Sequence, residues 1–85
     1  MLSFNYTITD NQGIHARPAG ALVKLVKDMD SKVTIKNGDK TANAARSLAI
    51  MSLGAKFGQT VKIVVEGGDE AGNLAKIEAF MKENL

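Results

Sequence analysis

The chain contains no cysteine and no tryptophan, and it has a single histidine and a single proline. Without cysteine there is neither a disulfide framework nor a thiolate metal site, and such a chain is compatible with a reducing cytoplasm. One histidine with no cysteine also argues against a structural zinc site. We therefore expect a fold that depends on its apolar core, with no metal and no cofactor.

Long apolar runs are missing as well. No stretch approaches the roughly 20 residues that a membrane-spanning helix needs. Residues 1–6 alternate in polarity, whereas a signal peptide has separate basic and apolar blocks. We expect a cytoplasmic protein that does not bind membranes, and the net charge of +2 is too small to indicate nucleic-acid binding.

Apolar residues are nevertheless sufficient for one domain over residues 1–85, since 45% of the chain is hydrophobic and 24% is charged. Apolar and polar residues alternate over residues 2–8, 33–35 and 61–66, which predicts strands with one buried face. Asn37-Gly38 is typical of a two-residue hairpin turn leading into another strand at residues 40–43. Each strand has a polar face, so we expect an antiparallel sheet with helices on one side only.

Three helices are expected between and after these strands. From Pro18 onward, apolar residues recur with helical spacing, as far as Val26. Residues 47–53 form a short apolar segment that Gly54 can end with a left-handed cap. Asp69 is a plausible N-cap for a last helix with an apolar stripe. The complete prediction is an α+β fold with the element order βαββαβα.

His15 lies where a loop enters the first predicted helix. A neutral imidazole with a pKa near ~6.5 is a competent nucleophile at physiological pH. A phosphoryl group there would lie at the helix N-terminus, to which Ala16 and Pro18 belong and where free backbone N–H groups favour anions, and beside the guanidinium of Arg17. Pro18 leaves two alternatives: the helix starts at Pro18, or Arg17 adopts a helical conformation at some cost. From spacing alone, a histidine in a loop before a helix is more often an ordinary cap or surface residue, and an arginine two residues away does not change that.

The segment Gly13–Ala19 (G-I-H-A-R-P-A) resembles the active-site segment of HPr, the phosphocarrier family of the bacterial sugar phosphotransferase system. The resemblance covers essentially the whole chain and includes Asn37-Gly38, the M-S-L-G motif at 51–54 and the G-G-D-E turn at 67–70. It implies an open-faced sandwich with three helices on a four-stranded sheet of order 1-4-2-3. It also implies that enzyme I phosphorylates His15 at Nδ1, with phosphoenolpyruvate as the ultimate donor, and that IIA domains of sugar transporters receive the group.

A carrier role fits the residues better than catalysis. The chain has no phosphate-cradling G-x-x-x-x-G-K-[ST] segment, no paired general base, and no acidic cluster that suggests Mg²⁺ binding. One arginine and a helix end would stabilise phosphohistidine only moderately, so that the group can be passed on. We therefore expect a stoichiometric phosphoryl carrier, which is not itself an enzyme.

A docking surface for enzyme I and IIA domains is expected on the first and second helices. Leu48 and Met51 form one pair at helical spacing, and Ile50 and Leu53 form another, so that one pair can face the core while the other stays exposed. The predicted docking residues are Gly20, Lys24, Lys27, Arg46, Ser47, Leu48, Ala49, Met51 and Ser52. Core packing is the alternative for any one apolar member, and ordinary solvated charge is the alternative for the basic ones.

One position departs from the family. Gram-positive members carry a regulatory serine at the start of the second helix, where this sequence has Arg46. Ser47 follows one residue later and is expected to be an N-cap. We therefore expect no regulation by the dedicated serine kinase, with Ser47 as a shifted phosphorylation site being the alternative that the sequence leaves open.

Two other functions can be compared with the carrier hypothesis. A purely regulatory binding protein with the HPr fold can lack the active histidine, whereas His15, Arg17 and Pro18 are all present here. An RNA-binding domain would need solvent-facing aromatic residues, but Phe4 and Tyr6 share a strand face with Leu2 and Ile8. A monomeric phosphocarrier remains the prediction, with regulatory proteins as further possible partners.

Overall fold

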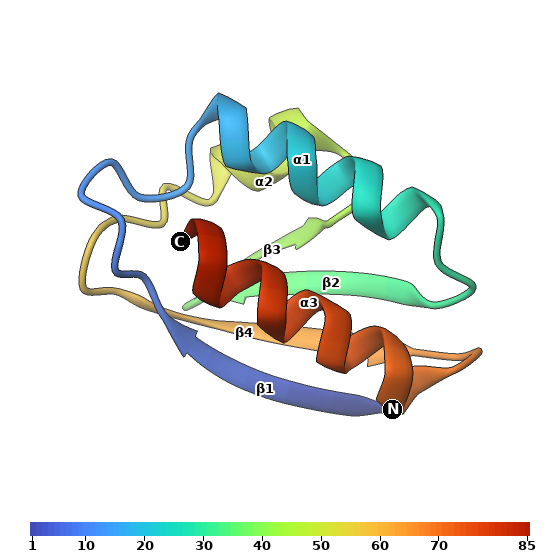
Figure 1. The fold of residues 1–85 in the computed structure, drawn as a ribbon. Coiled ribbons are helices and arrows are strands. Elements are labelled where there is room, and N and C mark those ends of the chain that lie inside the picture. Colours follow the sequence, from blue (N-terminus) through green and yellow to red (C-terminus); the bar gives the residue numbers. More distant parts are fainter.

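Four strands and three helices follow one another in the predicted order (Figure 1). In the computed structural model, which describes residues 1–85, the elements are β1 (Leu2–Thr7), α1 (Ala16–Lys27), β2 (Lys32–Asn37), β3 (Lys40–Asn43), α2 (Ser47–Ser52), β4 (Thr60–Glu66) and α3 (Glu70–Asn84). The strands form one antiparallel sheet in the order β1-β4-β2-β3. The three helices cover one face of this sheet (Figure 1). The predicted open-faced sandwich and its strand order are confirmed.

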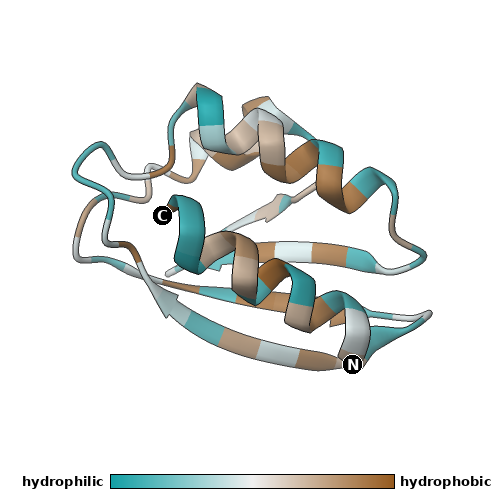
Figure 2. Cartoon of the chain, viewed as in Figure 1, coloured by the Kyte–Doolittle hydropathy of each residue, from teal (hydrophilic) through white to brown (hydrophobic).

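The strand β4 lies between β1 and β2 and shows why the sheet has one buried face. Its residues Val61, Ile63 and Val65 are buried, whereas Lys62 and Glu66 are exposed. Successive residues of a strand point to opposite faces, so this alternation turns the three apolar side chains toward the helices. Figure 2 shows the alternation of hydrophobic and hydrophilic residues along the strands.

The edge strand β1 carries two of the four aromatic residues. Phe4 is paired with Ile63 and Tyr6 with Val61 in the register of β1 and β4. Both rings are half-buried and pack against the core cluster. Because an RNA-stacking platform needs rings that face solvent, β1 does not provide one.

The helix α1 begins at Ala16, which decides between the two starts that the sequence left open. Arg17 is helical, and Pro18 occupies the third position of the helix. The first N–H groups of a helix have no acceptor within it, so the missing N–H of Pro18 costs no hydrogen bond there. The buried residues of the predicted apolar face are Ala19, Leu22 and Val26.

The hairpin between β2 and β3 differs from the prediction by one residue. Asn37 pairs with Lys40, so the two turn residues are Gly38 and Asp39 and not Asn37-Gly38. Gly38 has a φ of 61°, while no residue other than glycine has a positive φ. A left-handed residue only at the first turn position is typical of a type II′ turn, which accepts glycine there. Asn37 instead donates its Nδ2–H to the Leu53 carbonyl oxygen at 2.9 Å and links the hairpin to the end of α2.

The start of α2 corrects the expectation for Ser47. The N-cap position belongs to Arg46, and Ser47 is the first helical residue. Asn43 organises this start, because its Oδ1 accepts the Ala45 N–H at 2.9 Å and its carbonyl oxygen accepts the Arg46 N–H at 3.0 Å. The expected N-cap role of Ser47 is therefore wrong. The left-handed stop is confirmed by Gly54, which has a φ of 62°.

The last helix, α3, begins as the sequence predicts. The Asp69 side chain accepts the Gly72 N–H at 3.2 Å and so caps the helix. Ile77 and Met81 are fully buried, and Leu74 packs partly buried against the core. None of the three helices combines the length and apolar composition that a bilayer crossing requires.

A polar network joins the end of α1 to the start of α3. Asn73 is the only buried polar side chain, and its Nδ2 donates to Asp30 Oδ1 at 2.8 Å and to Ser31 Oγ at 2.7 Å. The Asp30 carboxylate also accepts the Asp69 N–H at 3.2 Å. The hydrogen bond from Asn73, followed by that from Asp69, lowers the pKa of Asp30 below its ordinary value of 3.8.

This network predicts an acid-dependent contribution to stability. A carboxyl group whose pKa is lower in the folded state stabilises the fold above its unfolded pKa, and the contribution disappears as the pH falls through the folded pKa. We expect the wild type to melt at a higher temperature than Asp30→Asn at pH 7. The difference should shrink as the pH is lowered below about 4, where protonation begins in the unfolded chain. Thermal melts from pH 7 to pH 2.5 measure it. A difference that stays constant over this range would contradict the linkage.

Candidate functional site

The loop between β1 and α1 positions His15, and it contains Gly13, which no other residue can replace without strain. Gly13 has a φ of 68°, and a Cβ built on it would lie 2.4 Å from the Ala55 carbonyl oxygen. The same oxygen accepts the Ile14 N–H at 3.0 Å, and the Ile14 side chain is buried. Within the loop, the Asp10 carbonyl oxygen accepts the Gly13 N–H at 3.0 Å. The backbone leading to His15 is therefore fixed against the segment that follows α2.

His15 occupies the N-cap position of α1, but its imidazole does not cap the helix. Its backbone is extended, with a φ of −123°, and its carbonyl oxygen accepts the first helical hydrogen bond, from Ala19 N at 3.0 Å. The side chain makes no capping hydrogen bond and is half-buried. The structure therefore rules out a role for the His15 side chain as an ordinary cap.

The helix N-terminus beside His15 has unused hydrogen-bond donors. The backbone N–H groups of Ala16 and Arg17 meet no acceptor in the protein, and Pro18 has no N–H. These two donors and the positive end of the helix dipole favour an anion next to the imidazole. The arrangement provides two backbone hydrogen bonds for phosphate oxygens without any rearrangement of the helix.

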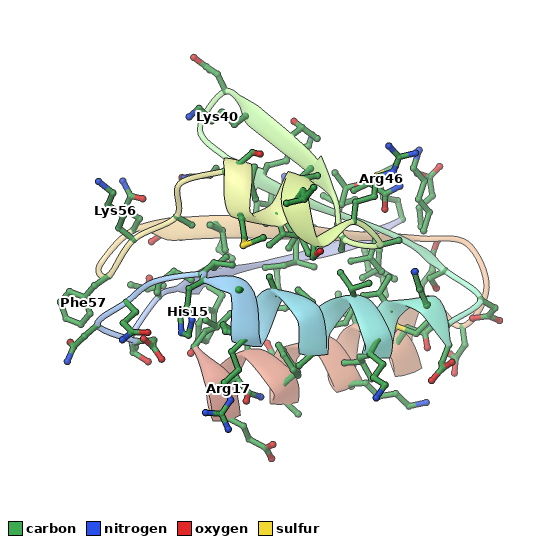
Figure 3. The ribbon with its side chains drawn as sticks, turned by 90° about the horizontal axis from the view of Figure 1, so that it is seen from above. His15, Arg17, Lys40, Arg46, Lys56 and Phe57 are labelled. Carbon is green, nitrogen blue, oxygen red and sulfur yellow. The ribbon has the colours of Figure 1, made fainter.

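Arg17 is an exposed cation without a carboxylate partner. The only ion pair in the chain joins the Met1 amino group to Glu70. Figure 3 shows Arg17 on the same end of α1 as His15, and its side chain is exposed. An arginine that is not engaged elsewhere can turn toward a phosphate group and offer it two parallel donors.

An open depression of about 740 Å³ connects His15 and Arg17 to parts of the chain that the sequence analysis did not include in the site. The residues that line it are Thr9, Asp10, Asn11, Gln12, His15, Arg17, Pro18, Ala21, Glu83 and Asn84. Glu83 and Asn84 lie at the end of α3, which the Leu85 main-chain oxygen fixes by accepting the N–H groups of Thr9 and Asp10. Only the topology brings this helix end to the site, so no local motif could have indicated it.

The two apolar pairs at helical spacing, Leu48 with Met51 and Ile50 with Leu53, differ in their burial. Ile50 and Leu53 are buried, at 0% and 3% exposure. Leu48 is 76% exposed, and Met51 is half-buried. The expectation is confirmed for the buried pair, Ile50 and Leu53, whereas only Leu48 of the other pair is exposed, because Met51 packs partly buried against the core.

The predicted docking residues lie on the outer faces of α1 and α2, which pack side by side (Figure 3). Those that are exposed are Gly20, Lys24, Lys27, Arg46, Leu48 and Ser52, whereas Ser47, Ala49 and Met51 are half-buried. Figure 3 shows Arg46 at the end of the molecule opposite to His15. The C-terminal end of α2, at Ser52, is the end nearer to His15. It leads directly to Ala55, whose carbonyl oxygen accepts the Ile14 N–H in the loop before His15.

The chain is similar to known proteins over nearly its whole length. The family model described as "PTS HPr component phosphorylation site" matches residues 2–83. The phosphocarrier protein HPr of Treponema pallidum (strain Nichols) is 34% identical over 78 residues, which cover 92% of this chain and 89% of that protein. The solved structure of the histidine-containing phosphocarrier protein of Mycoplasma is similar with a TM-score of 0.92 at 30% identity, covering 96% of this chain and 93% of its own. HPr-C-His from Thermoanaerobacter tengcongensis is 34% identical, with a TM-score of 0.81 and full coverage of both chains.

Proposed function

Because the chain belongs to the HPr family, the phosphocarriers of the phosphotransferase system, we propose that it accepts a phosphoryl group on His15 from phospho-enzyme I. Phosphoenolpyruvate is the ultimate donor, and the IIA domains of sugar transporters are the acceptors. The protein acts as a monomer in the cytoplasm. The protein is phosphorylated in one step and dephosphorylated in the next, so it acts as a stoichiometric reactant and not as an enzyme.

One observation carries this proposal: the fold places an imidazole at the start of a helix, and this side chain makes no capping hydrogen bond. His15 is fixed by its backbone, while its side chain caps nothing. The free N–H groups of Ala16 and Arg17 lie next to it, and the Arg17 guanidinium has no ion-pair partner. A nucleophile, two backbone donors and a free cation within three residues are what a phosphohistidine needs.

In the proposed step, Nδ1 of His15 attacks the phosphorus atom held by phospho-enzyme I. The new N–P bond forms as the bond between phosphorus and enzyme I breaks, and the departing group keeps the electron pair of the broken bond. The imidazole then releases its single proton, on Nε2, to solvent, and the departing group takes up one proton from solvent. The N–H groups of Ala16 and Arg17 and the Arg17 guanidinium receive the phosphate oxygens. Pro18, with its fixed φ, stiffens the helix start that holds these donors in place.

The openness of the site suits a group that must be passed on. His15 is half-buried and lies at the edge of a depression that is open to solvent. Few protein groups surround the phosphate, so a partner can approach the phosphorus atom directly. Reversal of the first step, with an acceptor nucleophile on the IIA domain, then releases His15 unchanged.

We include in the proposal a docking surface formed by α1 and α2, with Leu48 and Met51 as its apolar part. Its remaining members are Gly20, Lys24, Lys27, Arg46, Ser47, Ala49 and Ser52. The exposed basic side chains would steer an acidic partner toward this face. A serine switch is not part of the proposal, because Arg46 stands at the expected position and Ser47 is half-buried inside the first turn of α2.

The test of the proposal is incubation with enzyme I and phosphoenolpyruvate, followed by mapping of the phosphate. We expect one acid-labile phosphate per chain, on the peptide that contains His15. Two-dimensional ¹H–¹⁵N spectra of the imidazole assign it to Nδ1 or Nε2. Addition of a IIA domain should then remove the label. A chain that stays unlabelled, or carries an acid-stable phosphate, would refute the proposed function.

A substitution of Arg17 tests its part in the transfer. A hydrogen bond to a charged group contributes about 1.5–3 kcal/mol, so Arg17→Ala should slow transfer from enzyme I by about 10- to 100-fold. Arg17→Lys keeps the positive charge but loses the two parallel donors of the guanidinium group. Its transfer rate should therefore lie between those of the wild type and Arg17→Ala. The unfolding temperature should not change, because Arg17 is exposed and unpaired. Rapid-quench measurement of the labelled protein gives the rates, and an unchanged rate in Arg17→Ala would remove this residue from the mechanism.

A further inference from the structure

Phe57 is the one exposed aromatic residue of the chain. Its exposure is 59%, whereas Phe4, Tyr6 and Phe80 are partly buried against the core. Beyond the first two residues, the only other large hydrophobic side chain as exposed is Leu48. Figure 3 shows Phe57 projecting from the end of the molecule where His15 lies.

A tight turn presents this ring to solvent. The Gln59 N–H donates to the Lys56 carbonyl oxygen at 3.0 Å, and Gly58 has a φ of 85°. These features define a β-turn with glycine in the left-handed third position, as in type II, and place Phe57 at its corner. The Gln59 side chain closes the turn further by accepting the Lys56 N–H at 2.9 Å.

The same turn is tied to the loop that carries His15. The Ile14 N–H donates to the Ala55 carbonyl oxygen at 3.0 Å, and the Gly58 N–H donates to the Ile8 carbonyl oxygen at 2.9 Å. Gly13 packs so closely that a Cβ on it would lie 2.9 Å from the Lys56 Cα. These contacts fix the backbone positions of Phe57 and His15 relative to each other.

We propose that Phe57 is a specificity-determining contact for the phosphoryl donor. A donor that brings its phosphorus atom to His15 must cover this end of the molecule, including the turn at 56–59. Aromatic side chains are prominent among the residues that dominate binding energy, and a ring held on a rigid turn loses little entropy when it is bound. Phe57 adds to the proposed docking surface a second apolar contact, which lies on the turn at 56–59 and not on α2.

The chemistry of the donor surface follows from what surrounds the ring. Lys56 precedes Phe57, Arg17 lies at the same end of the molecule, and neither cation has an ion-pair partner. We expect an apolar recess for the ring on enzyme I, bordered by carboxylates that face Lys56 and Arg17. This inference rests on the proposed function, in which enzyme I is the donor.

Two phosphoryl donors separate docking from chemistry. Phospho-enzyme I must dock, whereas phosphoramidate is a small molecule that transfers its phosphoryl group to imidazole directly. In that reaction the N–P bond to His15 forms, the P–N bond of phosphoramidate breaks, and ammonia leaves with the imidazole proton as ammonium. We expect Phe57→Ala to lower kcat/KM with enzyme I by about 10- to 30-fold, mainly through KM. The rate with phosphoramidate and the unfolding temperature should equal those of the wild type.

Matched variants complete the experiment. Leu2→Ala removes an exposed apolar side chain at the far end of β1 and should leave both reactions unchanged. Phe57→Tyr keeps the ring and should restore most of the lost kcat/KM. The inference is overturned if Phe57→Ala keeps the wild-type kcat/KM with enzyme I, or if it slows the phosphoramidate reaction equally. A wild type that takes phosphate from phosphoramidate and not from enzyme I would overturn both the proposed donor and this contact.

Discussion

His15→Ala is expected to abolish phosphorylation by enzyme I, with a loss of at least about a thousandfold that leaves only background. No other imidazole exists in the chain to take over the role. The fold should survive, because the His15 side chain is half-buried and caps nothing. Acid-labile labelling together with a thermal melt measures both properties. An acid-labile phosphate that persists in a folded His15→Ala protein would exclude His15 as the acceptor.

His15→Asn separates the loss of phosphorylation from any loss of stability. Asparagine is among the best N-cap residues, and at this position its side-chain oxygen could accept the free N–H of Arg17, the second helical residue. We expect this variant to be inactive and yet more stable than His15→Ala by about 0.5–1 kcal/mol. Such a result would show that a capping side chain stabilises the fold at this position, where the His15 imidazole makes no cap hydrogen bond.

Gly13→Ala is expected to have the largest effect on stability and to damage the site at the same time. A residue with a Cβ is strained at a φ of 68°, and here the Cβ would also lie 2.4 Å from the Ala55 carbonyl oxygen. The left-handed backbone alone costs roughly 1–2 kcal/mol, and the clash with a backbone atom that cannot simply rotate away adds to it. We therefore expect a total loss of about 3 kcal/mol or more, measured by denaturant unfolding. The rate of phosphorylation should fall as well, because relief of the clash moves the His15 loop.

Gly38→Ala is the matched control for this substitution. Gly38 has a φ of 61°, close to that of Gly13, but a Cβ built on it meets nothing within 4 Å. It therefore reports the cost of the left-handed backbone without the clash, and it lies in the turn between β2 and β3, which does not line the depression at His15. Equal losses of stability in the two variants, or a normal rate of phosphorylation in Gly13→Ala, would contradict the role that we give to the contact between Gly13 and Ala55.

Local sequence patterns were sufficient to predict the structure where one physical preference dominates. Val61, Ile63 and Val65 alternate with polar residues, and their burial follows from the pleat of a strand. Gly54 and Asp69 end and begin helices for reasons contained in their own side chains. The sheet order, by contrast, was known only from the resemblance to a family, because the pairing of strands depends on contacts far apart in the sequence.

The predictions that failed did so where two preferences compete. Asn37-Gly38 is a good type I′ turn, but the hydrogen bond from Asn37 to Leu53 favours a turn one residue later. Ser47 has the composition of an N-cap, but Asn43 sets the start of α2 through its own side chain. Phe57 and the end of α3 were missed as parts of the His15 region because only the tertiary fold brings them there.

The position of β4 has a consequence for synthesis on the ribosome. This strand pairs with both β1 and β2, although it is the last of the four to be made. Until residues 60–66 have emerged, β1 has no partner strand, and folding must wait for contacts of high sequence separation. Ala55, which anchors the loop before His15, also emerges late. If the chain has the function that we propose, a nascent chain that displays His15 before residues 60–66 have emerged does not yet hold the acceptor in place.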